Sequence, residues 1–195
     1  MLYMAQVPLR QDTENYKPKK FLMWLFIITS CMLFAALTSA YIVYTGGDPS
    51  RGIKVKLPVE FIYSTILIVI SSATMHLAFK AAKAMDGSKQ RIFLAVTAAL
   101  GFAFFYSQYS AWNALFEAGA PFVNSNASES FIYVFSAFHV IHILAGICMI
   151  VYSMIRQGGK TTQAGNMFHM EVTSLFWHFL DILWIYLYVF LLLNQ

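Results

Sequence analysis

Residues 171–193 read EVTSLFWHFLDILWIYLYVFLLL, a stretch long and apolar enough to cross a lipid bilayer as one α-helix. His178 and Asp181 lie in its middle among apolar and aromatic residues. Even the most lenient insertion scales assign an aspartate at the centre of a membrane helix a cost of about 2.5–3.5 kcal/mol, so such a residue normally faces the protein interior and has a partner. The stretch therefore predicts a bundle of membrane helices around a polar group.

The composition of the whole chain is that of an integral membrane protein. Of its 195 residues, 59% are hydrophobic and 11% are charged, and the mean hydropathy is +0.62. Soluble domains have about a quarter of their residues charged. Further apolar stretches of membrane-spanning length precede residue 171. We therefore predict an all-α, polytopic membrane bundle (residues 21–195) of five transmembrane helices over about residues 21–45, 59–79, 92–112, 129–155 and 171–193.

The 13 Lys and Arg residues are unequally divided between the two ends of these helices. The loops opposite the N-terminus carry only Arg51, Lys54 and Lys56, and the other ten are on the N-terminal side. Basic residues in short loops remain in the cytoplasm. The division predicts a cytoplasmic N-terminus and a periplasmic C-terminus. The net charge of +4 is then explained by topology and gives no reason to expect a nucleic-acid partner.

Residues 1–20 form a polar segment ahead of the first apolar stretch. They include Pro8 and Pro18 and show no apolar periodicity. We expect a cytoplasmic N-terminal tail that is mobile or lies on a partner.

Polar residues share one side of each of the last two predicted helices, because positions three and four apart lie on the same face. In 129–155 they are His139 and His142, and in 171–193 they are Glu171, Ser174, His178 and Asp181.

Depth suggests how these groups pair. At 1.5 Å per residue, Asp181 lies about 15 Å and His142 about 20 Å from the cytoplasmic helix ends. We predict that they pair, and that Asp181→Leu is therefore destabilising. His178 with His76 is a second candidate pair. Gln108, about as deep as His139, also needs a hydrogen-bond partner.

Two other uses of these groups remain open. His76 and His178 lie at similar depth and could bind a metal or haem, although no further motif supports such a site. A small proton-coupled transporter would use Asp and His as a relay. Residues 182–193 offer only Trp184, Tyr186 and Tyr188 to continue a polar path, which favours a structural polar core.

The residues of this core resemble those of the cytochrome c oxidase subunit III family, subunit III of the haem-copper oxidases, in its short five-helix form. The resemblance rests on residues 26–30, residues 100–108, Phe138, His139, His142 and Gly146, and on a last-helix pattern that is the most specific: Glu171, Trp177, His178, Phe179, Asp181, Trp184, Leu187 and Tyr188.

This resemblance implies an accessory, non-catalytic subunit of a proton-pumping oxidase that reduces oxygen to water in a bacterial inner membrane. In the family, haem and copper belong to subunits I and II, so no cofactor is expected in this chain. Subunit III packs on subunit I, binds phospholipid, and supports proton uptake and active-site stability. The resemblance also implies that the oxidase could associate with other respiratory complexes in a supercomplex. A subunit III-like component of a quinol oxidase or nitric oxide reductase system is the closest alternative.

The resemblance also assigns residues. The intramembrane polar core, or lipid and subunit contacts, would comprise Gln108, His139, His142, Glu171, Trp177, His178, Asp181 and Trp184, with no catalytic or metal-binding residue. Many family members have a buried glutamate where this chain has Cys31, and a second acidic position is Ala111 here. A role of that glutamate in proton supply is therefore not expected.

Overall fold

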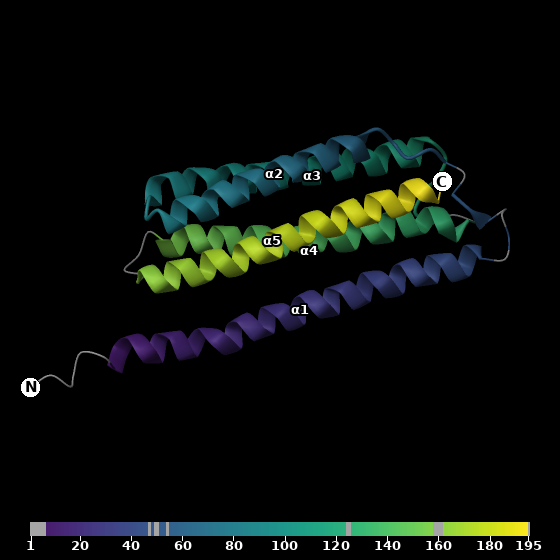
Figure 1. Cartoon of the computed structure of the whole chain (residues 1–195). Helices are drawn as coiled ribbons and strands as arrows, with labels where there is room; N and C mark the ends of the chain where they lie inside the picture. The colour runs from purple at the N-terminus through teal and green to yellow at the C-terminus, as the bar shows by residue number, and fades with distance from the viewer. Residues whose placement is uncertain are drawn as a thin grey trace, which may run out of the picture.

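The computed structural model describes residues 7–46, 48, 51–53, 55–123, 126–157 and 162–194, with side chains from residue 17 onward. These residues form five α-helices: α1 (Val7–Thr45), α2 (Glu60–Lys83), α3 (Gly87–Glu117), α4 (Ala127–Gln157) and α5 (Gln163–Leu193). All five are long and apolar enough to cross a membrane. The predicted all-α bundle of five membrane helices is confirmed, and Figure 1 shows the helices side by side.

The helices extend past the predicted apolar stretches. α5 begins at Gln163 and not at residue 171, and α3 begins at Gly87 and not at residue 92. Each of these starts has a polar cap: Thr162 accepts from the amide of Gly165, and Asp86 from that of Lys89. Hydropathy marks only the part of a helix inside the hydrocarbon, whereas backbone hydrogen bonds and caps continue it into the interface.

The first helix also begins earlier than expected. α1 starts at Val7 and includes Pro18, so residues 7–20 continue the membrane helix where we expected a tail. An apolar period is required only of a helix that buries one face, so the lack of such a period does not exclude a helix.

Helices α2, α3, α4 and α5 pack as a closed ring in which each contacts the next, and α5 returns to α2. α1 stands outside the ring against α4 and α5 (Figure 1). Its buried side chains follow a spacing of three or four residues: Ile27, Ser30, Phe34, Thr38 and Tyr41. Cys31 does not belong to this row of buried side chains and is exposed on the surface of the chain.

A tight turn joins α2 to α3. The amide of Met85 donates to Ala82 and that of Asp86 to Ala81, which is the hydrogen-bond pattern of a Schellman motif. Met85 occupies the left-handed position with φ 57°. The short connection holds α2 and α3 antiparallel and adjacent.

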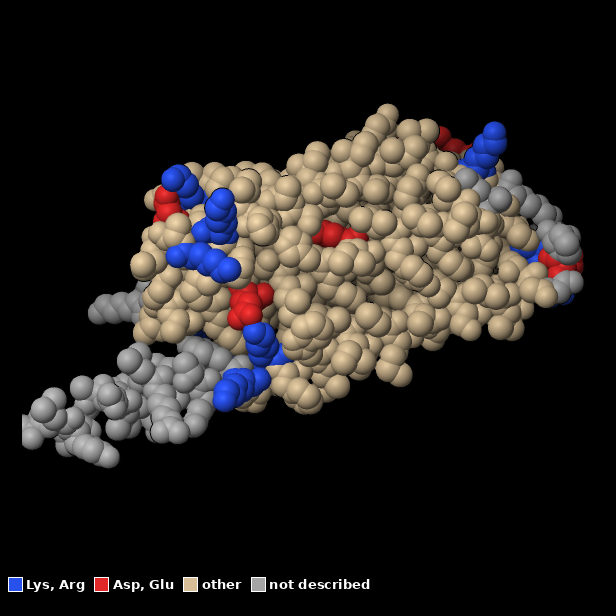
Figure 2. All heavy atoms as spheres, viewed as in Figure 1, with Lys and Arg blue, Asp and Glu red and all other residues tan. Residues whose placement is uncertain are grey.

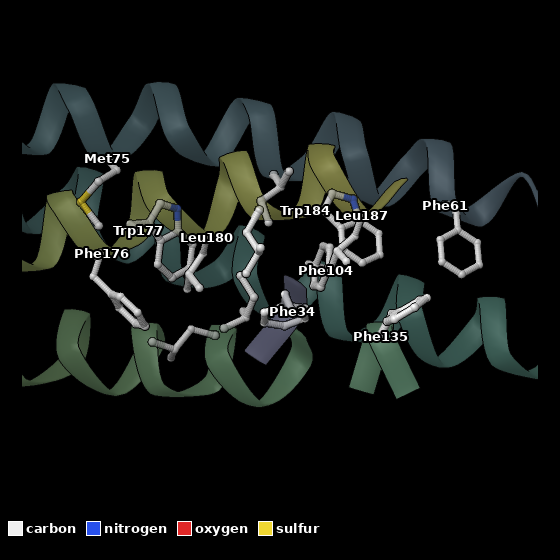
Figure 3. Packing of buried hydrophobic residues seen from close by; sticks show 14 of the residues in the cluster. Phe34, Phe61, Met75, Phe104, Phe135, Phe176, Trp177, Leu180, Trp184 and Leu187 are labelled. Atoms are coloured by element: carbon white, nitrogen blue, oxygen red, sulfur yellow. The ribbon is translucent and has the colours of Figure 1, made fainter. Parts of the chain in front are cut away.

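Aromatic side chains of α5 fill the centre of the ring. Trp177 and Trp184 are the largest fully buried side chains. Figure 3 shows both projecting from α5 among Phe104, Leu180 and Leu187. Phe61 of α2 stacks on Trp184 with the ring planes 4° apart and the centroids 6.0 Å apart.

The outer surface is apolar between two charged ends. In Figure 2 blue and red side chains gather at the ends, with tan between them and one red patch in the middle of the visible face. Within residues 21–46, 61–79, 92–116, 130–155 and 172–194, the sequence has one Asp, Glu, Lys or Arg, which is Asp181. An apolar belt between two charged ends is the distribution expected of a protein surrounded by lipid.

Candidate functional site: polar groups within the membrane

Asp181 lies between α5 and α2. Its side chain is only 6% exposed, and its Oδ2 lies 3.5 Å from Nδ1 of His178, one turn earlier. That nitrogen is hydrogen-bonded to Oγ of Ser72 on α2 at 2.8 Å. Neither carboxylate oxygen has a hydrogen-bond partner among the described residues. The carboxylate is therefore buried without a close hydrogen-bond partner among the described residues.

The predicted pair between Asp181 and His142 is wrong. His142 lies on the side of α4 that faces α1, where its Nε2 is 3.3 Å from Oγ of Ser30. Its Nδ1 is 2.7 Å from the carbonyl oxygen of Phe138. The two residues were matched by depth alone, and depth does not define the direction in which a side chain leaves its helix.

The two histidines of the second candidate pair lie close to the same pocket. His76 and His178 line the same pocket between α2 and α5, together with Ser72 and Asp181. Among the described residues, no three His, Cys, Asp or Glu side chains are grouped so that they could hold a metal ion.

His139 is enclosed by aromatic rings. It is fully buried, and its ring centroid lies 5.0 Å from that of Trp184 and 5.7 Å from that of Phe104. In the described part of the chain, neither of its ring nitrogens has a hydrogen-bond partner. His139 and His142, three positions apart, thus face different neighbours.

The buried amide of Gln108 has a partner for its nitrogen, whereas its Oε1 has none among the described residues. Its Nε2 donates to Oγ of Ser64 on α2 at 2.9 Å, and Ser64 and Ser107 are hydrogen-bonded to each other at 2.8 Å. Ser107 also donates to the carbonyl oxygen of Glu60. This cluster ties α2 to α3 near one end of the bundle.

The two tryptophans of the last-helix pattern hold α5 against α2. Nε1 of Trp177 donates to Ser71, and Nε1 of Trp184 donates to Thr65, each at 3.1 Å. On its other side, Trp177 packs tightly against Gly146: a Cβ there would lie 3.1 Å from the indole ring, which would have to shift by a few tenths of an ångström. These residues are structural contacts between helices.

Glu171 is not part of this core. It pairs with Lys20 of α1 at the end of the bundle, with side chains 48% and 42% exposed. Glu171 lies about 80° around α5 from Asp181 and ten residues closer to the end, where the carboxylate reaches a lysine. Cys31 is exposed, and Ala111, at the second acidic position of the family, is fully buried.

The sequence interpretation missed the hydroxyl partners. They lie in α2 at Ser64, Thr65, Ser71 and Ser72, and in α1 at Ser30. A run of serines and threonines in a membrane helix is a usable signal, because hydroxyls bond across helices in lipid.

Comparisons with known proteins give the family of the chain. The family model of cytochrome c oxidase subunit III matches residues 12–194. The chain is 30% identical to cytochrome c oxidase subunit 3 of Bacillus sp. (strain PS3), over 93% of this chain and 88% of the relative. It is 33% identical to cytochrome bo(3) ubiquinol oxidase subunit 3 of Pseudomonas aeruginosa, over 83% and 78%. A Synechocystis cytochrome c oxidase subunit 3 is 28% identical over 85% and 71%.

The family match extends over nearly all of the chain and covers α2 to α5 and most of α1. The family match and the relatives confirm the resemblance found in the sequence. The chain is a multi-pass membrane protein and belongs to the cytochrome c oxidase subunit III family of the haem-copper oxidases.

Proposed function

We propose that this chain is the accessory subunit III of a proton-pumping terminal oxidase in a bacterial inner membrane. It packs on subunit I of an enzyme whose haem and copper are in subunits I and II. The family match over residues 12–194 is the observation that carries this proposal. The relatives include subunits of both cytochrome c and ubiquinol oxidases, so either donor fits.

The orientation we propose follows from charge. Figure 2 shows blue side chains gathered mainly at the end where α2 meets α3. Lys80, Lys83, Lys89 and Arg91 belong to this end, which we place in the cytoplasm. The C-terminus is then periplasmic.

A pocket at this end supports the phospholipid part of the proposal. It has a volume of about 500 Å³ and lies where α1, α2 and α5 meet, with Lys17, Lys20 and Lys83 beside Phe79 and Phe168. Glu171, which also lines it, is paired with Lys20, so Lys17 and Lys83 are left to attract an anion. Basic pockets between membrane helices suit anionic headgroups.

The experiment that tests the subunit assignment is gentle purification through a C-terminal tag from native membranes, with an optical spectrum and mass spectrometry of the copurifying chains and lipids. Haem bands with two larger oxidase subunits support the proposal, and the donor that drives oxygen consumption identifies the enzyme. A colourless chain purified alone contradicts it.

The proposed role of the chain in proton uptake and active-site stability is tested by removing the chain from the enzyme. Oxidase depleted of this chain should take up protons more slowly and lose activity faster during turnover than the complete enzyme. Adding the chain back should restore both, and depletion without any effect would contradict this role.

The proposed phospholipid site is tested by substitution. Lys17→Gln combined with Lys83→Gln should reduce the amount of anionic phospholipid that the complex retains, whereas Arg51→Gln, at the opposite end, should not.

A further inference from the structure

A pocket of about 700 Å³ opens on the surface between α2 and α5, halfway through the membrane. Asp181 in its wall is about 27 Å along α5 from Gln163 and about 18 Å from Leu193. The rim residues Leu77 and Ile182 are 43% and 68% exposed. The pocket therefore faces outward, and its occupant must arrive through the hydrocarbon.

The pocket contains a carboxylate whose hydrogen-bonding capacity is not used. Asp181 lines it with its side chain 94% buried, and among the described residues neither of its oxygens has a hydrogen-bond partner. His178 is a distant partner, because its Nδ1 lies 3.5 Å from Oδ2 of Asp181 and is closer, at 2.8 Å, to Oγ of Ser72. A buried acceptor without a donor is costly, so the site suits a molecule that supplies O–H or N–H groups.

The remaining walls describe the rest of that molecule. Two imidazoles, His76 and His178, flank the pocket and can each donate or accept. Apart from Ser72, whose hydroxyl is bonded to His178, the other wall residues are aliphatic: Val69, Ala73, Leu77, Ile182 and Ile185. Small-molecule sites of 300–1,000 Å³ usually combine apolar walls with a few converging polar groups.

We propose that this pocket binds a membrane-soluble hydroquinone, an apolar ring with two O–H donors. One hydroxyl donates to Asp181, the second lies within reach of His76 or His178, and the ring packs on the aliphatic wall. A phospholipid does not fit, because its phosphate would be repelled by Asp181 and would have to leave the interface. An acyl chain has no donor. A neighbouring helix has its backbone groups already bonded and could supply a donor to Asp181 only through a side chain, which the crosslinking experiment below detects.

The test uses the full chain in lipid nanodiscs and a short-tailed azido-hydroquinone as photoprobe, with labelled peptides mapped by mass spectrometry. We expect saturable labelling within residues 69–77 and 178–185 that an unlabelled short-tailed hydroquinone displaces. Asp181→Asn should raise the half-saturating concentration roughly tenfold, because a charge-assisted hydrogen bond is lost.

A second pair of variants keeps the test independent of the buried carboxylate. Ala73→Phe fills the pocket without touching its hydrogen bonds and should abolish specific labelling. Ala145→Phe adds the same bulk to an exposed position of α4 outside the pocket and should leave labelling unchanged.

Three results would overturn the proposal. The first is labelling that does not saturate, and the second is labelling of these segments that persists in Ala73→Phe. The third is specific crosslinking of Ala73→Cys to another subunit in the intact complex, because it would show that a partner helix covers the pocket. Because nanodisc binding does not require the other oxidase subunits, failure here leaves the subunit assignment standing, and failure of copurification leaves this test unaffected.

Discussion

Oγ of Ser30 on α1 lies 3.3 Å from Nε2 of His142 on α4. This contact joins the helix outside the ring to the ring itself, within a stretch of α1 that has no charged residue from 21 to 45. The rings of Phe26 and Phe34 lie 6.0 and 5.5 Å from that of His142, so the polar contact is enclosed by aromatic ones. His142 is thus one of the polar contacts that hold α1 on the ring, together with Tyr186 of α5, which donates to Thr38.

The first prediction concerns this contact. Ser30→Ala and His142→Phe should each destabilise α1 packing, with a coupling of about 0.6–1.7 kcal/mol, the range for hydrogen bonds between membrane helices. A double-mutant cycle on reversible unfolding in mixed micelles measures it. Ser39→Ala, at an exposed position of the same helix, is the control. Additive effects of the two changes would show that Ser30 and His142 do not interact.

Asp181→Leu should leave the stability of the isolated chain unchanged or raise it by about 1–4 kcal/mol, because an isosteric apolar residue removes the desolvation cost of a poorly partnered charge. The sequence-based expectation was the opposite, since it assumed a close histidine partner. His178→Leu, which leaves the carboxylate in place without its contact, should be destabilising. Unfolding in lipid measures both changes, and a marked loss of stability in Asp181→Leu would reveal a partner that strongly stabilises the carboxylate.

Gly146→Ala should cost about 1–2 kcal/mol of stability, a balance between overpacking and the better helix propensity of alanine. The added Cβ would lie 3.1 Å from Trp177, whose indole is buried and bonded to Ser71 and therefore resists the shift that the Cβ requires. Ala145→Leu, at the exposed neighbouring position, should have little effect. Thermal unfolding of the purified chain compares the two, and Trp177→Phe should relieve the penalty of Gly146→Ala.

Met85→Gly should stabilise the chain by about 1 kcal/mol, because a side chain in the left-handed conformation is disfavoured by roughly that amount. The Schellman hydrogen bonds of Asp86 and Met85 require that conformation. Met85→Ala, which shortens the side chain but keeps the Cβ, should not reproduce the gain in midpoint temperature. Equal effects of the two variants would exclude relief of backbone strain as the cause.

Asp86 should make the first turn of α3 sensitive to acid. Its hydrogen bond with the Lys89 side chain, followed by that with the Lys89 amide, holds the pKa of Asp86 below its ordinary 3.8. A group with a lowered folded-state pKa stabilises the fold fully above its unfolded-state pKa and loses this effect as pH falls through the folded-state value. Midpoint temperatures measured from pH 6 down to pH 3 should therefore fall further in the wild type than in Asp86→Asn, which cannot titrate. Parallel curves would contradict this role of the cap.

The sequence predicted the number and type of helices well. Its apolar stretches have to be membrane helices because lipid offers the backbone no hydrogen bonds, and this holds whatever the packing. Helix ends were less predictable: Thr162 and Asp86 extend α5 and α3 through caps, and hydropathy does not register caps. The sequence also led us to expect a hydrogen-bond partner for Gln108, and the structure places Ser64 beside its amide nitrogen but no partner beside its Oε1 among the described residues.

The identity of the partners was decided by the tertiary structure alone. His139 and His142 are about 60° apart around α4, and that rotation sends one to Trp184 and the other to Ser30. Asp181 faces α2, and Glu171 reaches Lys20 because it lies at the helix end. Composition and spacing determine which groups enter the membrane and how deep they lie, since these depend on one helix at a time. Which groups meet depends on the order and rotation of helices around the ring, which is set by the packing of all five at once.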